Sequence, residues 1–192
     1  MKILRLFNKI FWIILKSNLK FLKPEKKKIL IFDYVNSEIL RDYLPEKDKS
    51  ILYTRKEELN LFILFLNFIR GKFTPLDYFQ FYIDTVKPKL IITCIDNNPL
   101  FYKLKINNQQ KKIVIATTWR TPVHDSSIFQ IENSKIKVIK DESYNVDYVF
   151  TLNKNIGDIF YSLNAKKVIT IGSFKSNHHI IKTKKNLELL FI

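Results

Sequence analysis

Residues 86–98 read Val86-Lys87-Pro88-Lys89-Leu90-Ile91-Ile92-Thr93-Cys94-Ile95-Asp96-Asn97-Asn98. The run at 90–95 is apolar apart from Thr93, and an unbroken apolar run of this length predicts a strand buried on both faces of a sheet. Pro88 ends the helix expected before it, because proline cannot continue a helix. Cys94 lies inside the run and is predicted to be a buried thiol. Strands of this kind occur in parallel sheets that carry helices on both faces, so the stretch predicts an α/β domain.

The same kind of apolar run recurs on both sides of this stretch. Strands are predicted at residues 29–32, 50–54, 113–117, 148–152 and 168–171, and helices at residues 37–43, 75–86 and 156–163. Apolar strands that alternate with helices indicate a Rossmann-like parallel sheet with helices on both faces. In such a sheet, ligands bind beyond the carboxyl ends of the strands. Residues 126–146 are polar and weakly periodic, and we expect them to form a mobile excursion from the sheet.

Two neighbouring segments carry recognisable helix boundaries. Residues 59–69 are apolar almost all round, interrupted only by Asn60 and Asn67, which predicts either a buried helix or a helix with a lipid-facing side. Gly71 is placed to end this helix, because glycine readily adopts the left-handed conformation found just past helix ends. The next helix starts at Thr74-Pro75-Leu76-Asp77, with threonine as N-cap, proline at the first position and aspartate near the positive end of the helix dipole.

The composition excludes several classes of protein. Three scattered glycines cannot build the Gly-rich loop of a P-loop NTPase or of a standard dinucleotide-binding protein. One cysteine excludes a disulfide framework and a multi-cysteine zinc site, and it fits a reducing compartment. At 192 residues the chain accounts for one domain or slightly more. Its 33 Lys and Arg against 18 Asp and Glu give a net charge of +15, and the position of that charge is more informative than its size.

The positive charge is concentrated at the amino terminus, where residues 1–28 contain nine Lys or Arg and one Glu, a net charge of +8. On a helix at about 100° per residue, the basic side chains share one face, and the aliphatic and aromatic side chains occupy the opposite one. This pattern predicts that residues 1–27 form an amphipathic helix in the interface of an anionic membrane. The predicted membrane contacts are Lys2, Arg5, Lys9, Trp12, Lys16 and Lys20.

Other interpretations of this segment remain open. Its longest stretch without a charge is six residues, at 10–15, whereas a membrane-spanning helix needs about 20. No small-residue cleavage site follows, as a secretory signal would require. The helix could instead pack on its own domain. A nucleic-acid partner would explain the basic face and leave the apolar face without a partner, so we expect no nucleic-acid partner.

Polar side chains collect where the predicted strands end, and they are the candidate site residues. An aromatic beside an arginine, at Trp119-Arg120, suits stacking on a sugar ring and bidentate contact with phosphate. Asp96 and His124 are the candidates for a catalytic base that accepts a hydroxyl proton. The remaining candidates for acceptor or phosphate binding are Asp33 and Ser37 after the first strand, Asn97 and Asn98 after the strand at 90–95, and Ser173 and Lys175 after the last strand.

Several of these candidates have an ordinary structural alternative. The Asp96-Asn97-Asn98 run could cap the next helix, Arg120 could pair with Asp125, and His124 could be a solvated loop histidine. We expect no metal site, because no Asp-x-Asp occurs and the pair His178-His179 has no further ligand at metal-binding spacing.

A series of short motifs extends along the predicted domain. They are Ile31-Phe32-Asp33 followed by Ser37-Glu38-Ile39-Leu40, residues 86–93 running into Asp96-Asn97-Asn98 and Phe101-Tyr102-Lys103, Val146-Asp147-Tyr148, and residues 171–177. In their order and spacing these motifs resemble bacterial surface-carbohydrate proteins of the O-antigen biosynthesis type, over roughly residues 28–177. The resemblance implies a glycosyltransferase of the two-Rossmann GT-B kind, which needs no bound metal and whose amino-terminal half faces the acceptor.

The expected organisation is an amphipathic helix at 1–27, a Rossmann-like acceptor-side domain at 28–177, and a tail at 178–192 that could begin a second domain. The resemblance implies a role in surface polysaccharide assembly on a lipid-linked or glycan acceptor, in the cytoplasm at the inner membrane. No cofactor is expected, and the nucleotide-sugar donor would be bound by a second half or a partner chain. The alternatives are a non-catalytic membrane-peripheral binding module and, third, a basic nucleic-acid-binding protein.

Overall fold

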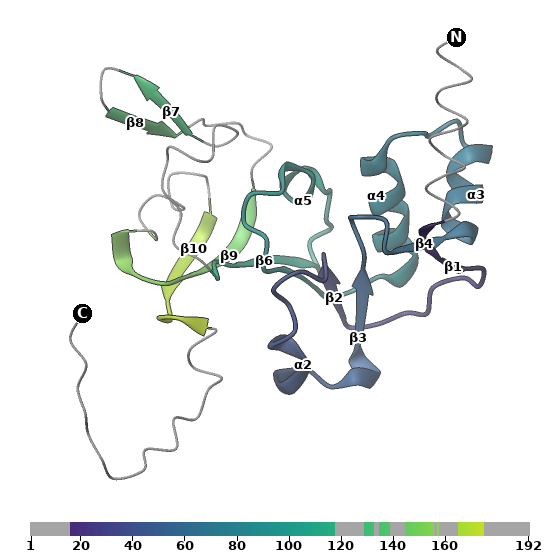
Figure 1. Ribbon diagram of the computed structural model, residues 1–192, viewed down its shortest axis with the longest axis horizontal. Helices are drawn as coiled ribbons and strands as arrows, with labels where there is room; N and C mark the ends of the chain where they lie inside the picture. The colour runs from purple at the N-terminus through teal and green to yellow at the C-terminus, as the bar shows by residue number, and fades with distance from the viewer. Residues whose placement is uncertain are drawn as a thin grey trace.

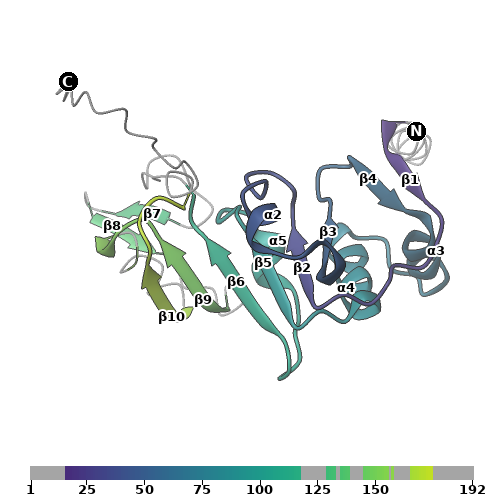
Figure 2. The ribbon, with the colours of Figure 1, turned by 90° about the horizontal axis from the view of Figure 1, so that it is seen from below.

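A computed structural model describes residues 16–117, 129–132, 135–138, 145–155, 157 and 165–174. At its centre lies a six-stranded sheet in the order β10-β9-β6-β5-β2-β3, with every neighbouring pair parallel (Figure 1). Figure 2 shows these strands side by side from below. The strands are β2 (Ile29–Phe32), β3 (Lys49–Leu52), β5 (Leu90–Thr93), β6 (Lys111–Ile115), β9 (Val146–Thr151) and β10 (Ala165–Thr170). The predicted α/β class and the Rossmann-like parallel sheet are confirmed.

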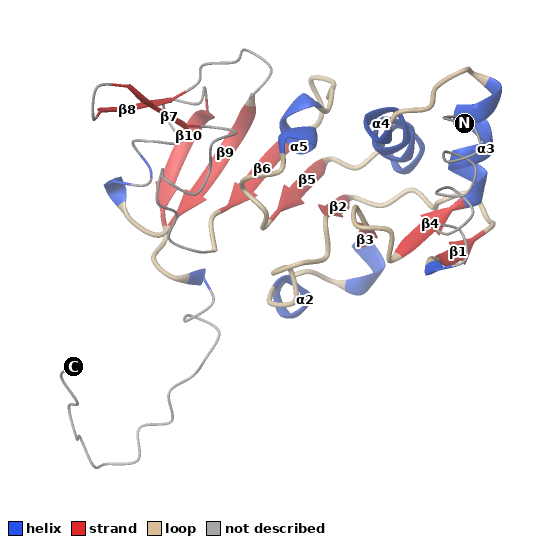
Figure 3. Cartoon of the chain, turned by 45° about the horizontal axis from the view of Figure 1, so that its top comes forward, coloured by secondary structure: helices blue, strands red, loops and turns tan. Residues whose placement is uncertain are grey.

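Apolar side chains cover both faces of the sheet, because successive residues of a strand point to opposite sides. On β2, Leu30 and Phe32 belong to one core and Ile31 to the other. Figure 3 shows α4 and α5 on one side of the sheet and α2 on the other. Cys94 is buried in the α2-side core, as predicted. The helices are α2 (Leu40–Tyr43), α3 (Leu61–Ile69), α4 (Pro75–Val86) and α5 (Pro99–Lys103), with a 3-10 turn at Glu46–Asp48.

The chain enters the domain through a small separate sheet. β1 (Asn18–Lys20) pairs in parallel with β4 (Glu58–Asn60), which continues directly into α3. The prediction of a helix over residues 1–27 is therefore wrong at 18–27, because the ladder to β4 holds 18–20 extended and residues 21–27 continue without helical structure. Residues 1–15, which include Lys2, Arg5, Lys9 and Trp12, lie outside the described residues.

The boundaries between α3 and α4 are those that the sequence predicts. Gly71 has a positive φ of 65° and follows the last turn of α3. Thr74 is the N-cap of α4, and its side chain and that of Asp77 form a reciprocal capping box. Asn60 caps α3 by accepting a hydrogen bond from the backbone N–H of Ile63.

Two predicted segments differ from the structure. The helix expected at 37–43 is present only at Leu40–Tyr43, because residues 34–37 form a turn closed by the Ser37 N–H, which donates to the carbonyl of Tyr34. Within the expected excursion at 126–146, β7 (Phe129–Glu132) and β8 (Lys135–Val138) pair as an antiparallel hairpin, which lies at the β9–β10 end of the molecule in Figure 1. Most of the helix expected at 156–163 falls outside the described residues.

Candidate functional site

The strand order places a topological switch point between β2 and β5. From β2 the chain passes to β3 on one side, and from β5 it passes to β6 on the other, so the loops after these neighbouring strands lead away in opposite directions. In parallel α/β sheets, ligands bind at the carboxyl ends of the strands at such a point. We call the residues following these strand ends the β2/β5 edge. The sequence-predicted candidates Asp33, Ser37, Asp96, Asn97 and Asn98 all belong to it.

Asp33 is held by several contacts at the β2/β5 edge. Its side chain is buried, and its backbone has a left-handed φ of 74°. One carboxylate oxygen accepts a hydrogen bond from the Val35 N–H at 3.0 Å. The other accepts from the Thr54 hydroxyl at 2.6 Å and from Arg55 Nε at 3.3 Å. Asp33 therefore fixes the loop after β2 to the loop after β3.

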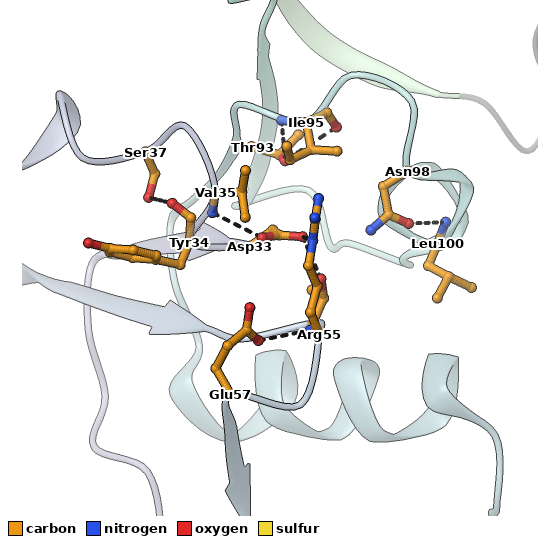
Figure 4. A network of polar contacts seen from close by, with 11 residues as sticks. Asp33, Tyr34, Val35, Ser37, Arg55, Glu57, Thr93, Ile95, Asn98 and Leu100 are labelled. Atoms are coloured by element: carbon orange, nitrogen blue, oxygen red, sulfur yellow. Dashed lines mark hydrogen bonds and ion pairs between the residues drawn. The ribbon is translucent and has the colours of Figure 1, made fainter. Parts of the chain in front are cut away.

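Arg55 is a site residue that the sequence analysis did not single out. Its side chain is 55% exposed although its Nε is held by the buried carboxylate of Asp33. Figure 4 shows the side chain extending past Asp33 toward the loop after β5, which carries Asn98. Within the described part of the chain no hydrogen bond occupies its two Nη groups. An arginine presented in this way can bind phosphate or carboxylate with two parallel hydrogen bonds.

A signal for Arg55 was present in the sequence. The strand predicted at 50–54 ends directly before Arg55, and the rule that ligands lie beyond the carboxyl ends of parallel strands applies to this strand as well. The Arg55 N–H also donates to Glu57 at 3.0 Å, and Lys56 has a positive φ of 72°, so the arginine lies on a tightly turned loop.

On the β5 side, the structural alternative for Asn98 is correct. Asn98 is the N-cap of α5, and its side-chain oxygen accepts a hydrogen bond from the Leu100 N–H at 3.0 Å. Asp96 is buried, and its backbone carbonyl accepts from the hydroxyl of Tyr102 at 2.6 Å. Asn97, between them, is partly exposed. Asp96 and Asn97 thus remain the candidates on this loop for contact with a ligand.

Ser37 has a local role in the structure. It is buried, and its hydroxyl donates to the carbonyl of Tyr34 in the turn before α2. Figure 4 shows this turn, with the ring of Tyr34 directed away from Arg55. The ring of Tyr34 lies 6.0 Å from the ring of Tyr53. The pKa of Tyr53 is raised, first by burial and then by the nearby Glu58, Tyr34 and Glu57. The Ser37 hydroxyl therefore stabilises the loop, and a contact of Ser37 with a ligand stays a prediction.

Ser173 lies farther along the sheet than the other candidates. It follows β10, which is separated from β5 by β9 and β6. The next residue, Phe174, packs its ring 5.7 Å from that of Tyr43 on α2. Ser173 thus lies between the end of β10 and the contact that Phe174 makes with α2. The remaining candidates Trp119, Arg120, His124 and Lys175 lie outside the described residues.

Of the predicted membrane contacts, Lys16 and Lys20 are described, and both are exposed. Lys20 Nζ lies 3.7 Å from a carboxylate oxygen of Glu58, across the β1–β4 pair. The two residues line a pocket of about 400 Å³ with Pro24 and Tyr82, away from the β2/β5 edge. Among the described residues, none of the helices has both the length and the apolar character needed to span a bilayer. In the same ranges, no three His, Cys, Asp or Glu side chains gather as metal ligands would.

The comparisons with known proteins concern the second half of the sheet. No curated protein and no solved structure matches the chain significantly. Residues 113–192 match the model of a family described as "putative O-antigen biosynthesis protein". The matched range begins within β6 and contains β9 and β10, and it leaves out β2 and β5. The match supports a role for this chain in O-antigen biosynthesis.

Proposed function

We propose that this chain is a glycosyltransferase-like protein of O-antigen biosynthesis, and that its β2/β5 edge binds a phosphate-bearing acceptor. The observation that carries the proposal is Arg55, a half-exposed cation held in place by the buried Asp33 at the switch point of a parallel sheet. A lipid-linked sugar acceptor carries a diphosphate, and this group suits the bidentate donors of arginine. The family match to residues 113–192 supports the biosynthetic setting.

In the proposed reaction, a hydroxyl of the acceptor attacks the anomeric carbon of a nucleotide sugar and the nucleoside diphosphate leaves. The hydroxyl proton passes to a carboxylate or imidazole base as the new bond forms. Asp96 is the candidate base within the described residues, because it is a buried carboxylate on the loop after β5. His124 is the second candidate. The donor would be bound by a second domain or a partner chain.

The proposed location is the cytoplasmic side of the inner membrane, where lipid-linked acceptors reside. The net charge of +15, with +8 in residues 1–28, supports peripheral attachment to anionic lipid. A peripheral position would bring the β2/β5 edge close to the diphosphate of an acceptor whose lipid remains in the bilayer.

Binding of a short-chain polyprenyl diphosphate sugar to the 192-residue chain tests the acceptor site. Arg55→Ala should weaken this binding about tenfold or more, because it removes charge-assisted hydrogen bonds. Arg41→Ala is the matched control, since Arg41 is an exposed arginine on α2 whose Nε donates to the carbonyl of Glu38. Equal affinities for the wild type and Arg55→Ala would contradict the proposed acceptor site.

Transfer assays with nucleotide sugars separate the enzyme from the non-catalytic alternative. If the chain binds the acceptor but transfers no sugar, alone or with a donor-binding partner, it is a binding module. If Asp96→Asn retains acceptor binding and loses transfer, Asp96 acts in the reaction. Tight, salt-sensitive binding to duplex nucleic acid without lipid would favour the third interpretation instead.

A further inference from the structure

We propose that the carboxyl end of α3 and the turn after it form a lipid-binding surface of the folded domain. This surface, which we call the α3 patch, consists of Phe65, Phe68, Ile69 and Phe73 with the cations Arg70 and Lys72. The exposed fractions of the four apolar residues are 62%, 68%, 62% and 73%. Large apolar side chains that are exposed together mark sites of protein or membrane contact.

The α3 patch is contiguous because of helix geometry. Phe65, Phe68 and Ile69 are spaced three and four residues apart, so they lie on one side of α3. The opposite side, with Ile63 and Asn67, is buried. Phe73 joins the exposed side from beyond the helix, since its ring centroid lies 5.8 Å from that of Phe68 in an edge-to-face contact.

A well-defined helix end holds Phe73 in this position. The Lys72 N–H donates to the carbonyl of Asn67, and the Gly71 N–H donates to that of Phe68. These two bonds, with the left-handed φ of Gly71, make up a Schellman motif. Immediately after Phe73, the capping box of Thr74 and Asp77 starts α4. The aromatic surface is therefore built on two fixed helix ends.

Charge complementarity identifies an anionic lipid surface as the partner. Between residues 59 and 76 the only charged side chains are Arg70 and Lys72, both positive. The Arg70 guanidinium lies over the ring of Phe81 at 4.4 Å, so one cation is held at the border of the patch. Apolar aromatics beside cations form the pattern by which helices bind the interface of anionic bilayers.

The same charges disfavour the two protein partners that the chain itself could supply. A second copy of the patch would bring Arg70 and Lys72 against their own like charges. The segment at residues 1–15 carries Lys2, Arg5 and Lys9 and no acidic residue, so it offers no opposite charge to Arg70 and Lys72. An anionic lipid surface satisfies the apolar and the positive side chains at once. This inference does not depend on glycosyl transfer and would hold for a non-catalytic protein.

A local probe on the full chain tests the patch separately from the amino-terminal segment. The chain has a single cysteine, Cys94, which is buried, so Lys72→Cys can be labelled selectively with an environment-sensitive fluorophore. The matched control is Lys103→Cys, an exposed lysine on α5. On vesicles of phosphatidylcholine with about 30% phosphatidylglycerol, we expect a blue shift from the label at 72 and none at 103. On pure phosphatidylcholine the shift at 72 should be much weaker.

Unlabelled variants provide the second measurement. Phe68→Ser combined with Phe73→Ser should lower the affinity for the anionic vesicles about tenfold or more, because two exposed rings no longer enter the interface. Tyr43→Ser, which alters an exposed aromatic on α2, should leave the affinity unchanged. A silent label at position 72, whether or not the chain binds vesicles, would overturn the proposal. So would a shift at 72 that appears without lipid and grows with protein concentration, because that result identifies a second copy as the partner.

Discussion

At the scale of single residues, Asp33 shows how much one side chain determines at the β2/β5 edge. It accepts hydrogen bonds from Val35, Thr54 and Arg55 while its own backbone has a φ of 74°. Aspartate and asparagine adopt this left-handed conformation at lower cost than other non-glycine residues. The position thus requires a short polar residue both for its backbone and for its carboxylate.

This double requirement predicts different outcomes for two substitutions. Asp33→Val should destabilise the protein by about 2 kcal/mol more than Asp33→Asn, because valine is strained at positive φ and leaves the three donors unpaired. Urea unfolding of both variants measures the difference. Equal losses of unfolding free energy would show that neither the backbone nor the acceptor role is as described.

Lys112 is a second residue with a specific physical role, near the amino-terminal end of the interior strand β6. It is buried on β6, and its ammonium donates to the carbonyls of Tyr102 at 2.7 Å and Leu104 at 3.2 Å, at the end of α5. Burial lowers the pKa of Lys112 to about 8, with a smaller contribution from Lys166, while the charge of Asp147 opposes the shift. The folded protein therefore loses this proton at a lower pH than the unfolded chain.

The consequence is a stability that rises with pH in a defined window. Between about pH 8 and 10.5 the unfolded chain still binds the proton that the folded protein has released, so the free energy of unfolding increases with pH. Relative to Lys112→Met, the wild type should gain about 2 kcal/mol between pH 7.5 and 9.5. Urea unfolding at both pH values measures the gain. Tyr78, whose pKa burial raises to about 12, titrates above this window and is present in both proteins. A constant difference between the two proteins would contradict the shifted pKa.

At the scale of elements, the ends of helices determine where the chain turns. Gly71 has a φ of 65°, and no atom lies within 4 Å of the position that a Cβ would take. Gly157 is the reverse case, because a Cβ there would lie 2.9 Å from Val168 Cγ1 on β10. The two glycines are thus required for different reasons, one conformational and one steric.

Gly71→Ala should destabilise the protein by about 1 kcal/mol, the cost of a left-handed alanine, without disturbing the packing around it. Thermal unfolding together with near-ultraviolet circular dichroism measures both effects. Gly157→Ala serves as the comparison and should alter the packing between residue 157 and β10 as well. A loss of native circular dichroism in Gly71→Ala would contradict the open surroundings described for Gly71.

The position of a strand or helix could be predicted from the sequence better than the strand with which it pairs. The apolar run at 90–95 and the Thr74–Asp77 start of α4 depend on local patterns, and both appear in the structure within one or two residues. β1 could not be predicted, because Asn18–Lys20 is extended only through its ladder with β4, about 40 residues away in the sequence. The β7–β8 hairpin was missed for a similar reason, since its segment has little periodicity of its own.

At the scale of the whole molecule, Asp147 connects three of the six strands of the central sheet, β6, β9 and β10. It lies on β9, one of its oxygens accepts from the backbone N–H of Lys112 on β6 at 2.9 Å, and the other accepts from Lys166 on β10 at 2.8 Å. Burial alone would raise the pKa of Asp147, but the hydrogen bonds from Lys166 and Lys112 and the charges of Lys166 and Lys111 lower it. Three neighbouring strands therefore share one ionised carboxylate.

Because the pKa of Asp147 is lowered in the folded state, its stabilising contribution is present above the unfolded pKa of about 3.9 and disappears as the pH falls through the folded value. Asp147→Asn should therefore cost about 1 kcal/mol at pH 7 and less below pH 4. Unfolding free energies at the two pH values measure this, with Asp84→Asn, an exposed aspartate on α4, as the control. A loss that does not change with pH would contradict the ionised contact.

The β2/β5 edge also shows what the sequence could not reveal about the whole molecule. The polar residues after each strand could be identified, but which strand ends are neighbours depends on the strand order. That order places Asp33 next to the loop of Asp96, and it makes β10, the strand before Ser173, the third strand from β5. Arg55 could be identified in the same way, as the residue after the strand predicted at 50–54, but its bond to Asp33, 22 residues away, could not.

The pairing of β1 with β4 has a mechanical consequence. The amino-terminal end of β1 lies opposite Glu58, and α3 continues from the other end of β4, beyond Asn60. A pull on the chain before β1 against an anchored α3 would act along the two strands in opposite directions. The force would then be shared, in shear, by all hydrogen bonds of the β1–β4 ladder. Two further bonds, from Ser17 to Lys56 and from Asn60 to Leu22, would share it as well. Tension between two points of attachment to a surface would thus be carried by these hydrogen bonds, and the six-stranded sheet would bear none of it.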